Sequence, residues 1–191
     1  TSGHATMQIT IRNLTVQRGT ATALRIDALD IPAGVTTLVG PNGSGKSTLL
    51  HAIAGLLPVN GEVQVLGHDP ATARRSVAYV LQTQHVAAQL PVTAREVVSL
   101  GRTPSVGPIR RLRRVDREAV DRALERMELD ALADRHLTEM SGGQRQRVFI
   151  AQGLVQDAEV LLLDEPVAGL DMVSAERIRA ARPFHSVGEL H

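Results

Sequence analysis

The residues with the clearest chemical potential lie in the stretch GPNGSGKST, residues 40–48. Its first eight letters fit the phosphate-binding pattern G-x-x-x-x-G-K-S without a mismatch. Glycines let successive backbone N–H groups turn toward one phosphate, and a helix that starts beside the loop adds its positive dipole end. We therefore expect the whole stretch to bind a nucleoside triphosphate: Gly40, Pro41, Asn42, Gly43, Ser44, Gly45, Lys46, Ser47 and Thr48.

Lys46 is the only lysine in a chain that has 21 lysine and arginine residues in total. A compact ammonium can reach the β- and γ-phosphate oxygens as a point charge, whereas the planar guanidinium of arginine is bulkier. Lys46 is therefore predicted to be catalytic as well as phosphate-binding. Ser47, the next residue, is the natural ligand for Mg²⁺.

A second acidic site follows the apolar run VLLL at residues 160–163. In phosphate-loop NTPases an aspartate at such a strand end holds Mg²⁺ through water, and a following glutamate orients or deprotonates the attacking water. We assign these roles to Asp164 and Glu165. On its own this pair would more often be a turn or a helix cap, but the upstream phosphate loop favours a catalytic interpretation.

The surrounding pattern predicts the elements that must position these residues. Residues 7–16 alternate apolar and polar side chains, as a half-buried strand does, and residues 61–66 and 76–81 are predicted to be further short strands. A short β-rich run at 35–39 precedes the phosphate loop, and a helical pattern follows it from 46 to 57. The run before Asp164 is typical of a strand buried on both faces.

Residues 92–134 change to a helical period. Val97, Val98 and Leu100 are predicted to form one apolar stripe, and a second stripe runs from Val115 to Met127. Asp116 is placed to cap the second helix. The arginine-rich connector between the two helices is interpreted as a solvated basic loop, with contact to anionic lipid or a partner as the alternative.

Composition excludes several classes of protein. The chain has 191 residues, 43% hydrophobic residues, no cysteine and a net charge of +1, which indicates one soluble globular domain and argues against nucleic acid as a partner. No apolar run approaches the roughly 20 residues that span a bilayer. The seven histidines lack paired ligand spacing, so they are interpreted as ordinary surface or core residues. Residues 1–6 are expected to be a tag remnant.

The motif MSGGQRQR at residues 140–147, together with the phosphate loop and the acidic pair, resembles the signature of the ATP-binding cassette (ABC) ATPases. Its usual form is LSGGQ, and Met140 is a conservative departure. Gln82 in AYVLQ matches the family's Q-loop, and AGLD at 168–171 matches its D-loop. The resemblance covers residues 7 to about 179, with the motifs in the family's order.

This resemblance implies ATP and Mg²⁺ as cofactors and assigns further site residues. Ser141, Gly142, Gly143 and Gln144 would meet the γ-phosphate bound to a second subunit, so that two chains sandwich two nucleotides. Gln82 would be a catalytic and metal-linked residue, and Asp171 would lie at the nucleotide interface. Arg18 stands where the family usually stacks an aromatic side chain on adenine; a guanidinium can also stack on a base, with weaker selectivity.

The resemblance also implies a role in transport. Residues 89–102 and 144–171 look most like the ATPases of manganese, zinc and iron uptake transporters, with iron-siderophore and cobalamin importers as relatives. The expected protein powers import of a metal ion or metal chelate from the inner face of the membrane, where it is a peripheral cytoplasmic subunit. Its partners would be membrane permease subunits, a second copy of the chain and, indirectly, a substrate-binding protein.

The predicted fold is an α/β phosphate-loop NTPase core with a mixed or parallel sheet, an N-terminal antiparallel β region and an inserted helical subdomain. Residues 7–87 and 136–182 are expected to form the core, 88–135 the helical subdomain and 183–191 an irregular tail. The family's switch histidine is not found, and His185 comes too early, so C-terminal truncation is expected. Two alternatives stay open: a nucleotide-binding but hydrolytically impaired fragment, and a soluble ABC ATPase without a transport role.

Overall fold

The computed structural model describes residues 7–34, 36–38, 40–41, 43–80, 91–102, 112–164, 185–187 and 189–190. Within them the chain forms two compact units, and each is described by itself. The first unit contains residues 1–79, 159–164 and 183–191, and the second contains residues 80–158 and 165–182. The sequence-based division differs from these units, because it grouped residues 136–158 with the nucleotide-binding core; as a functional division it stays a prediction.

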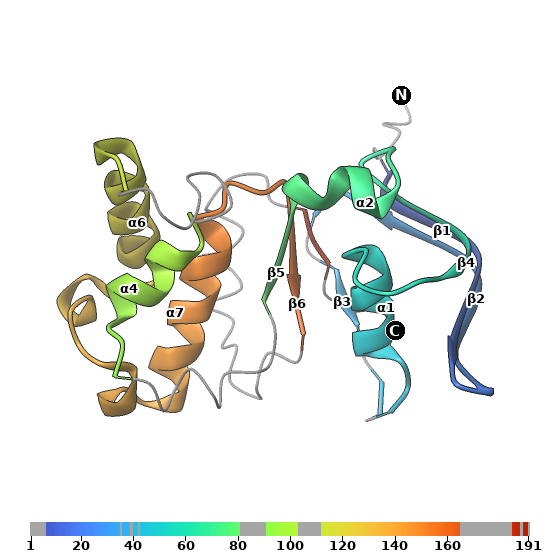
Figure 1. Ribbon diagram of the computed structural model, residues 1–191, viewed down its shortest axis with the longest axis horizontal. Coiled ribbons are helices and arrows are strands. Elements are labelled where there is room, and N and C mark those ends of the chain that lie inside the picture. Colours follow the sequence, from blue (N-terminus) through green and yellow to red (C-terminus); the bar gives the residue numbers. More distant parts are fainter. Residues whose placement is uncertain are drawn as a thin grey trace. The chain divides into compact units, whose positions relative to one another are not determined.

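The first unit is built on strands whose bounds agree closely with the alternating patterns in the sequence (Figure 1). The strands are β1 (Met7–Arg18), β2 (Ala21–Pro32), β3 (Thr37–Leu38), β4 (Asn60–Val65), β5 (Val77–Val80), β6 (Val160–Leu163), β7 (His185–Val187) and β8 (Glu189–Leu190). Its helices are α1 (Lys46–Ile53), α2 (Pro70–Ala73) and the 3₁₀ turn η1 (Arg74–Ser76).

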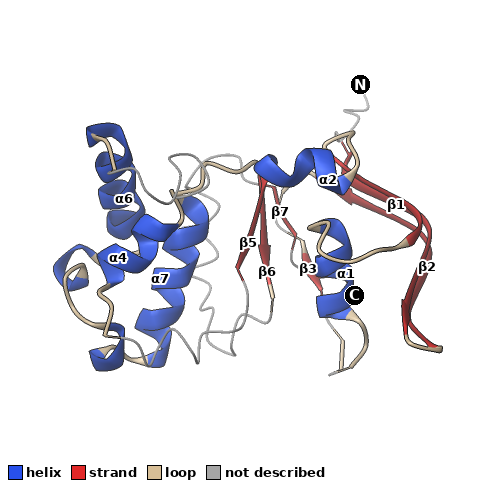
Figure 2. Cartoon of the chain, in the orientation of Figure 1, coloured by secondary structure: helices blue, strands red, loops and turns tan. Residues whose placement is uncertain are grey.

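Three sheets organise the strands (Figure 2). An antiparallel sheet has the order β2-β1-β4, which confirms the predicted N-terminal antiparallel region. A second sheet pairs β3 with β8 in parallel, and a third has the order β5-β6-β7 with β6 and β7 parallel. The segment 183–191, predicted to be an irregular tail, thus contains two short strands among its described residues. Its backbone groups form ladder hydrogen bonds with distant strands, which local polarity in so short a segment does not reveal.

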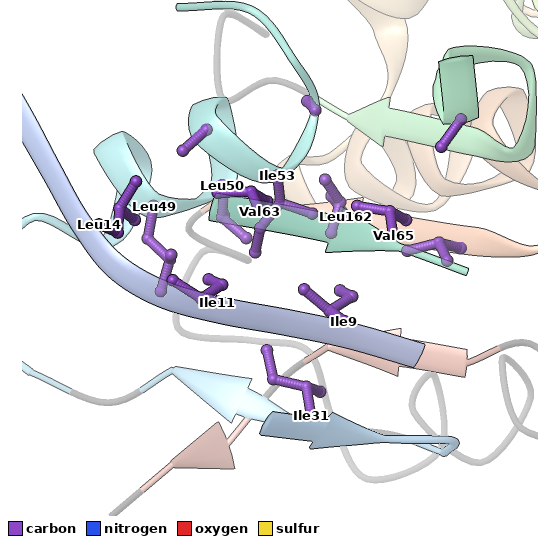
Figure 3. Close-up of a cluster of buried hydrophobic side chains, with 14 of the residues drawn as sticks. Ile9, Ile11, Leu14, Ile31, Leu49, Leu50, Ile53, Val63, Val65 and Leu162 are labelled. Atoms are coloured by element: carbon purple, nitrogen blue, oxygen red, sulfur yellow. The ribbon is translucent and has the colours of Figure 1, made fainter. Parts of the chain in front are cut away.

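One apolar cluster joins the antiparallel sheet to α1 and β6 (Figure 3). Ile9 and Ile11 of β1 point into it, Leu50 and Ile53 enter from α1, and Leu162 enters from β6. The first three residues of β6 are fully buried, which confirms a strand covered on both faces. This packing holds the start of α1 and the end of β6 in one unit, and those two points carry the site described below.

The second unit is helical. It contains α4 (Ala94–Leu100), α6 (Arg114–Arg126), the 3₁₀ turns η2 (Asp130–Leu132) and η3 (Leu137–Glu139), and α7 (Gly142–Leu154). The three α-helices pack against one another. Val97 and Val98 are buried as predicted, but Leu100 and Val115 are 60% and 52% exposed, so their assignment to the apolar stripes is wrong. Val115 lies off the face that the buried residues Asp116, Val120, Ala123 and Leu124 set on α6, and Leu100 is the last residue of α4.

A buried ion pair lies at the start of α6, where Asp116, the neighbour of the exposed Val115, pairs with Arg102. Helix α6 begins at Arg114, and Asp116 caps it as predicted, from the third helical position, where its side chain accepts from the backbone N–H of Arg113. Its carboxylate is inaccessible to solvent and accepts hydrogen bonds from the Arg113 N–H (3.0 Å) and from Arg102 Nη2 (2.9 Å). Arg102 also donates to Val155 O (3.0 Å) and to Asp157 (2.8 Å), which follow α7. The pair therefore ties the ends of α4, α6 and α7 together.

Candidate functional site

The phosphate loop lies between β3 and α1, as the motif predicts. Gly45 precedes α1 with φ +94°, and a Cβ there would lie 2.9 Å from Leu24 Cδ1. The left-handed backbone therefore favours glycine here, and a larger residue would also have to displace the Leu24 side chain of β2. The residue before α1 is Gly45, so the position that usually supplies a capping side chain has none. The free N–H groups and the positive end of the helix dipole consequently favour an anion at this end of the helix.

Lys46 is the first residue of α1, and its side chain folds back across the loop. Its Nζ donates to Gly40 O at 2.7 Å and to Pro41 O at 2.9 Å, while the Ser44 N–H donates to Pro41 O at 3.1 Å. These bonds place a positive point charge among the turning backbone groups of the loop. Thr48 follows on α1 with its side chain buried, so the loop is anchored from behind by the core.

Ser47 and Asp164 meet at the edge of the first unit although 117 residues separate them in sequence. The Ser47 Oγ donates to Asp164 Oδ1 at 2.9 Å, and both side chains are partly buried. One oxygen comes from the first turn of α1 and the other from the residue that ends β6. A hydroxyl and a carboxylate are hard oxygen ligands of the kind Mg²⁺ prefers, so the residues present fit this cation.

Tyr79 is a member of this cluster that sequence reasoning missed. Its hydroxyl, on β5, donates to Asp164 Oδ2 at 3.0 Å. Its ring meets the ring of His51 on α1 edge to face, with centroids 5.5 Å apart. Burial, together with the hydrogen bond to Asp164, raises the pKa of Tyr79 above its ordinary value, so the hydroxyl keeps its proton at neutral pH. The only available signal was the tyrosine's place three residues before Gln82, which does not reveal its partner.

The signature motif forms the start of α7. Ser141 Oγ accepts from the Gln144 N–H at 3.2 Å, and Gln144 Oε1 accepts from the Ser141 N–H at 2.9 Å. This reciprocal capping occupies the side chains of both residues. Gly142 and Gly143 are exposed, and among the described residues a Cβ at either position would meet no atom within 4 Å. The fold of this unit therefore does not itself require glycine there, although each glycine destabilises a helix by about 1 kcal/mol relative to alanine.

The predicted site residues divide between the two units. The phosphate loop, Ser47 and Asp164 belong to the first unit, and the signature residues Ser141 to Gln144 belong to the second. Arg18 is exposed at the tip of the β1–β2 hairpin, where it pairs with Ala21. Four predicted residues lie outside the described part of the chain: Asn42, Gln82, Glu165 and Asp171.

An apolar cavity of about 480 Å³ adjoins the phosphate loop within the first unit. Leu24, Ile26 and Leu29 of β2 line one side of it, and Gly40 and Lys46 line another. The β2 side offers mainly apolar side chains. Recognition of charge in this region consequently falls to the loop itself.

No group of three or more histidine, aspartate or glutamate side chains in the described part of the chain could hold a metal ion. None of its helices combines the length and the hydropathy needed to cross a bilayer.

Comparison with known proteins adds independent information. The sequence model of the ABC transporter family matches residues 24–168. The zinc transport system ATP-binding protein TroB of Treponema pallidum (strain Nichols) is 45% identical over 150 residues, which cover 78% of this chain and 56% of TroB. The manganese transport system ATP-binding protein MntB of Listeria innocua is 42% identical over 166 residues, which cover 86% of this chain and 69% of MntB.

A solved structure agrees with the fold. The cbiO1 protein from Clostridium perfringens, part of the ABC transporter complex cbiONQ, superposes with a TM-score of 0.77 at 28% identity. The match covers 95% of this chain and 76% of that one. The chain thus spans between just over half and about three quarters of the lengths of these relatives.

Proposed function

Because the chain belongs to the ABC transporter family of ATP-binding proteins, we propose that it binds and hydrolyses MgATP to drive transport. The observation that carries this proposal is the contact between Ser47 and Asp164 beside Lys46. Two motifs predicted separately to serve Mg²⁺ and the phosphates meet in one unit. A structural serine–aspartate contact would not need a lysine-bearing anion loop next to it.

The residues of the loop would divide the work of holding a triphosphate. Backbone N–H groups at the start of α1 would donate hydrogen bonds to phosphate oxygens, and Lys46 would place its positive charge beside the β- and γ-phosphate oxygens. Ser47 and Asp164 would hold Mg²⁺, directly or through water. When bound, the cation neutralises charge on the phosphate oxygens. Arg18 would lie against the base.

Hydrolysis requires a group that orients or deprotonates water, and we assign this role to Glu165. It follows Asp164 directly in the sequence, as the catalytic glutamate of the acidic pair is expected to do. A carboxylate in that place can accept a proton from water as water attacks the γ-phosphate. Gln82 and Asp171 are proposed to complete the site from the Q-loop and the D-loop.

The exposed start of α7 is proposed to complete the nucleotide site of a second copy. Its helix is capped by the side chains of Ser141 and Gln144, which leaves the Gly142 and Gly143 N–H groups to meet an outside anion. Open space around both glycines supports close approach by a ligand that this unit does not supply. Two chains would then bind two ATP molecules between them.

The cargo is proposed from the relatives. TroB and MntB are named for zinc and manganese transport, so we propose import of a metal ion or a metal chelate through membrane permease subunits. The chain would act from the inner face of the membrane and meet a substrate-binding protein only indirectly. The helical segment 88–135 is proposed to contact the permease, and the exposed Leu100 and Val115 offer it apolar contact area.

Metal uptake in cells that lack this subunit tests the proposal. The wild-type chain should restore uptake of radioactive manganese or zinc, and Lys46→Ala should not. Arg25→Ala is the matched control, because it removes one positive charge from an exposed site on β2. Equal uptake with wild type and Lys46→Ala would contradict a role for the phosphate loop. If the wild-type chain restores uptake of neither manganese nor zinc, free or chelated, the proposed cargo is wrong.

A further inference from the structure

Tyr79 lies beside Ser47 and Asp164, and it belongs neither to the phosphate loop nor to the acidic pair that predict these two metal ligands. It is the only tyrosine of the chain, and it stands on β5, the strand next to β6 in their sheet. Its ring is half-buried, and its hydroxyl donates to Asp164 Oδ2 at 3.0 Å. The contact joins residues 85 positions apart, so it is a product of the fold and not of local sequence.

The carboxylate of Asp164 is consequently held from two sides. Ser47 Oγ donates to Oδ1 from the first turn of α1, and the Tyr79 hydroxyl donates to Oδ2 from β5. Two donors on different oxygens fix the rotation of the carboxylate about its last bond. Each oxygen still has a free lone pair, because a carboxylate oxygen can accept two hydrogen bonds.

The ring of Tyr79 is itself fixed by packing. His51 in the last turn of α1 meets it edge to face, with an angle of 81° between the rings. Helix α1 therefore contributes Ser47 at its start and a support for Tyr79 near its end. A side chain that both packs against α1 and donates to Asp164 can transmit the position of the helix to the carboxylate.

We propose that Tyr79 is a positioning residue for Mg²⁺ binding, which holds Asp164 in the orientation the cation requires. The proposal rests on the proposed function, since it needs MgATP to bind at Ser47 and Asp164. Ligating carboxylates are commonly hydrogen-bonded by neighbouring groups, and removal of such a neighbour typically weakens metal affinity by about 10- to 100-fold. Tyr79 touches neither nucleotide nor water in this role and acts only through Asp164.

Titration calorimetry of ATP binding at a series of Mg²⁺ concentrations, and in EDTA, tests the role. Tyr79→Phe keeps the ring and its contact with His51 but removes the hydroxyl. The Mg²⁺ concentration at half-maximal enhancement of ATP affinity should rise about tenfold, while ATP affinity in EDTA stays unchanged. Thr72→Val is the matched control: it removes a hydroxyl that donates to the Asp69 carboxylate at 2.6 Å on α2, and it should leave both quantities unchanged.

Two results would overturn the proposal. An unchanged Mg²⁺ requirement in Tyr79→Phe would show that the hydroxyl does not serve Asp164. An equal loss of affinity with Mg²⁺ and with EDTA would show a merely structural role. If the wild type itself binds no ATP with Mg²⁺, the proposed function fails, which is a distinct outcome.

A second measurement keeps the proposal testable if Tyr79→Phe does not fold. Growth on fluorotyrosine labels Tyr79 alone, because the chain has one tyrosine. Its fluorine NMR signal should move when Mg²⁺ is added to the ATP-bound wild-type chain, and Asp164→Ala should abolish this movement. A fluorine chemical shift that stays the same when Mg²⁺ is added to the wild type would contradict the link between Tyr79 and the metal ligand Asp164.

Discussion

Ser47 Oγ lies 2.9 Å from Asp164 Oδ1 and donates a hydrogen bond to it. This contact brings the start of α1 and the end of β6 together, and with them the only lysine of the chain. The apolar cluster beneath it, to which both α1 and β6 contribute, holds the two oxygens in place. The separate motifs of the sequence therefore become one site through packing of the core.

Removal of either the Ser47 hydroxyl or the Asp164 carboxylate should reduce the gain in ATP affinity that Mg²⁺ provides. In Ser47→Ala and Asp164→Ala, the improvement of ATP affinity by Mg²⁺ should fall at least about tenfold, because a hard oxygen ligand is lost. Equilibrium titration with Mg²⁺ and with EDTA measures this ratio. Ser76→Ala is a suitable control, since it removes a hydroxyl bonded to Glu159 elsewhere in the same unit. A ratio equal to that of wild type in both variants would contradict the assignment of the two ligands.

Substitution of a signature glycine should weaken dimerisation without lowering the stability of the single chain. Gly143→Ala meets no atom of the described structure and replaces a poor helix former, so the free energy of unfolding should stay unchanged or rise by up to about 1 kcal/mol. In a Glu165→Gln background, which should trap an ATP-bound dimer, the added methyl group should weaken MgATP-dependent dimerisation at least about tenfold. Thermal unfolding and light scattering measure the two effects.

The control for assembly is Glu118→Ala on α6, which changes an exposed residue away from the glycines. A Glu165→Gln chain that stays monomeric with MgATP would refute the sandwich of two copies. Normal dimerisation of the Gly143→Ala double variant would remove the start of α7 from the interface.

Arg102 should be important for the stability of the helical unit. Its side chain is 11% exposed, and it donates to the fully buried Asp116 and to the carbonyl of Val155. Arg102→Leu would remove the closer of the two arginines that pair with this buried carboxylate and leave only Arg113, whose Nε lies at 3.4 Å, so Tm should fall by roughly 5–10 °C. Arg25→Leu removes an exposed pair with Asp27 and should change Tm by less than about 2 °C. Equal effects of both substitutions would contradict the special role of the buried pair.

The same pair should make stability depend on acid. Burial alone would raise the pKa of Asp116, but hydrogen bonds from Arg102 and from the Arg113 N–H hold it below its ordinary value. Its contribution is therefore complete above the ordinary carboxyl pKa of about 4 and is lost as pH falls through the lower folded-state pKa. Asp116→Asn should flatten the loss of Tm below about pH 4, whereas Asp27→Asn should leave that slope unchanged.

Much of the site could be predicted because its signals are local. The phosphate loop and the acidic pair each occupy a few consecutive residues. A glycine such as Gly45 also indicates a position where the backbone is left-handed. Strand β6 was predictable because a strand buried on both faces carries an unbroken apolar run.

The rest could not be predicted because it depends on distant partners. Tyr79 is placed by its hydrogen bond to a carboxylate 85 residues away, and Asp116 pairs with an arginine in the turn that follows another helix, α4. Leu100 and Val115 were assigned to apolar stripes from the helical period, but both side chains are exposed in the structure. Short strands such as β7 pair through backbone groups, which carry little side-chain pattern.

The most direct test of the whole account is calorimetric titration of the chain with MgATP. We expect saturable binding by the wild type, retained in Arg25→Ala and lost in Lys46→Ala, because the Lys46 ammonium lies within the phosphate loop whereas Arg25 is an exposed residue of β2. Unchanged MgATP affinity in Lys46→Ala would contradict the central claim.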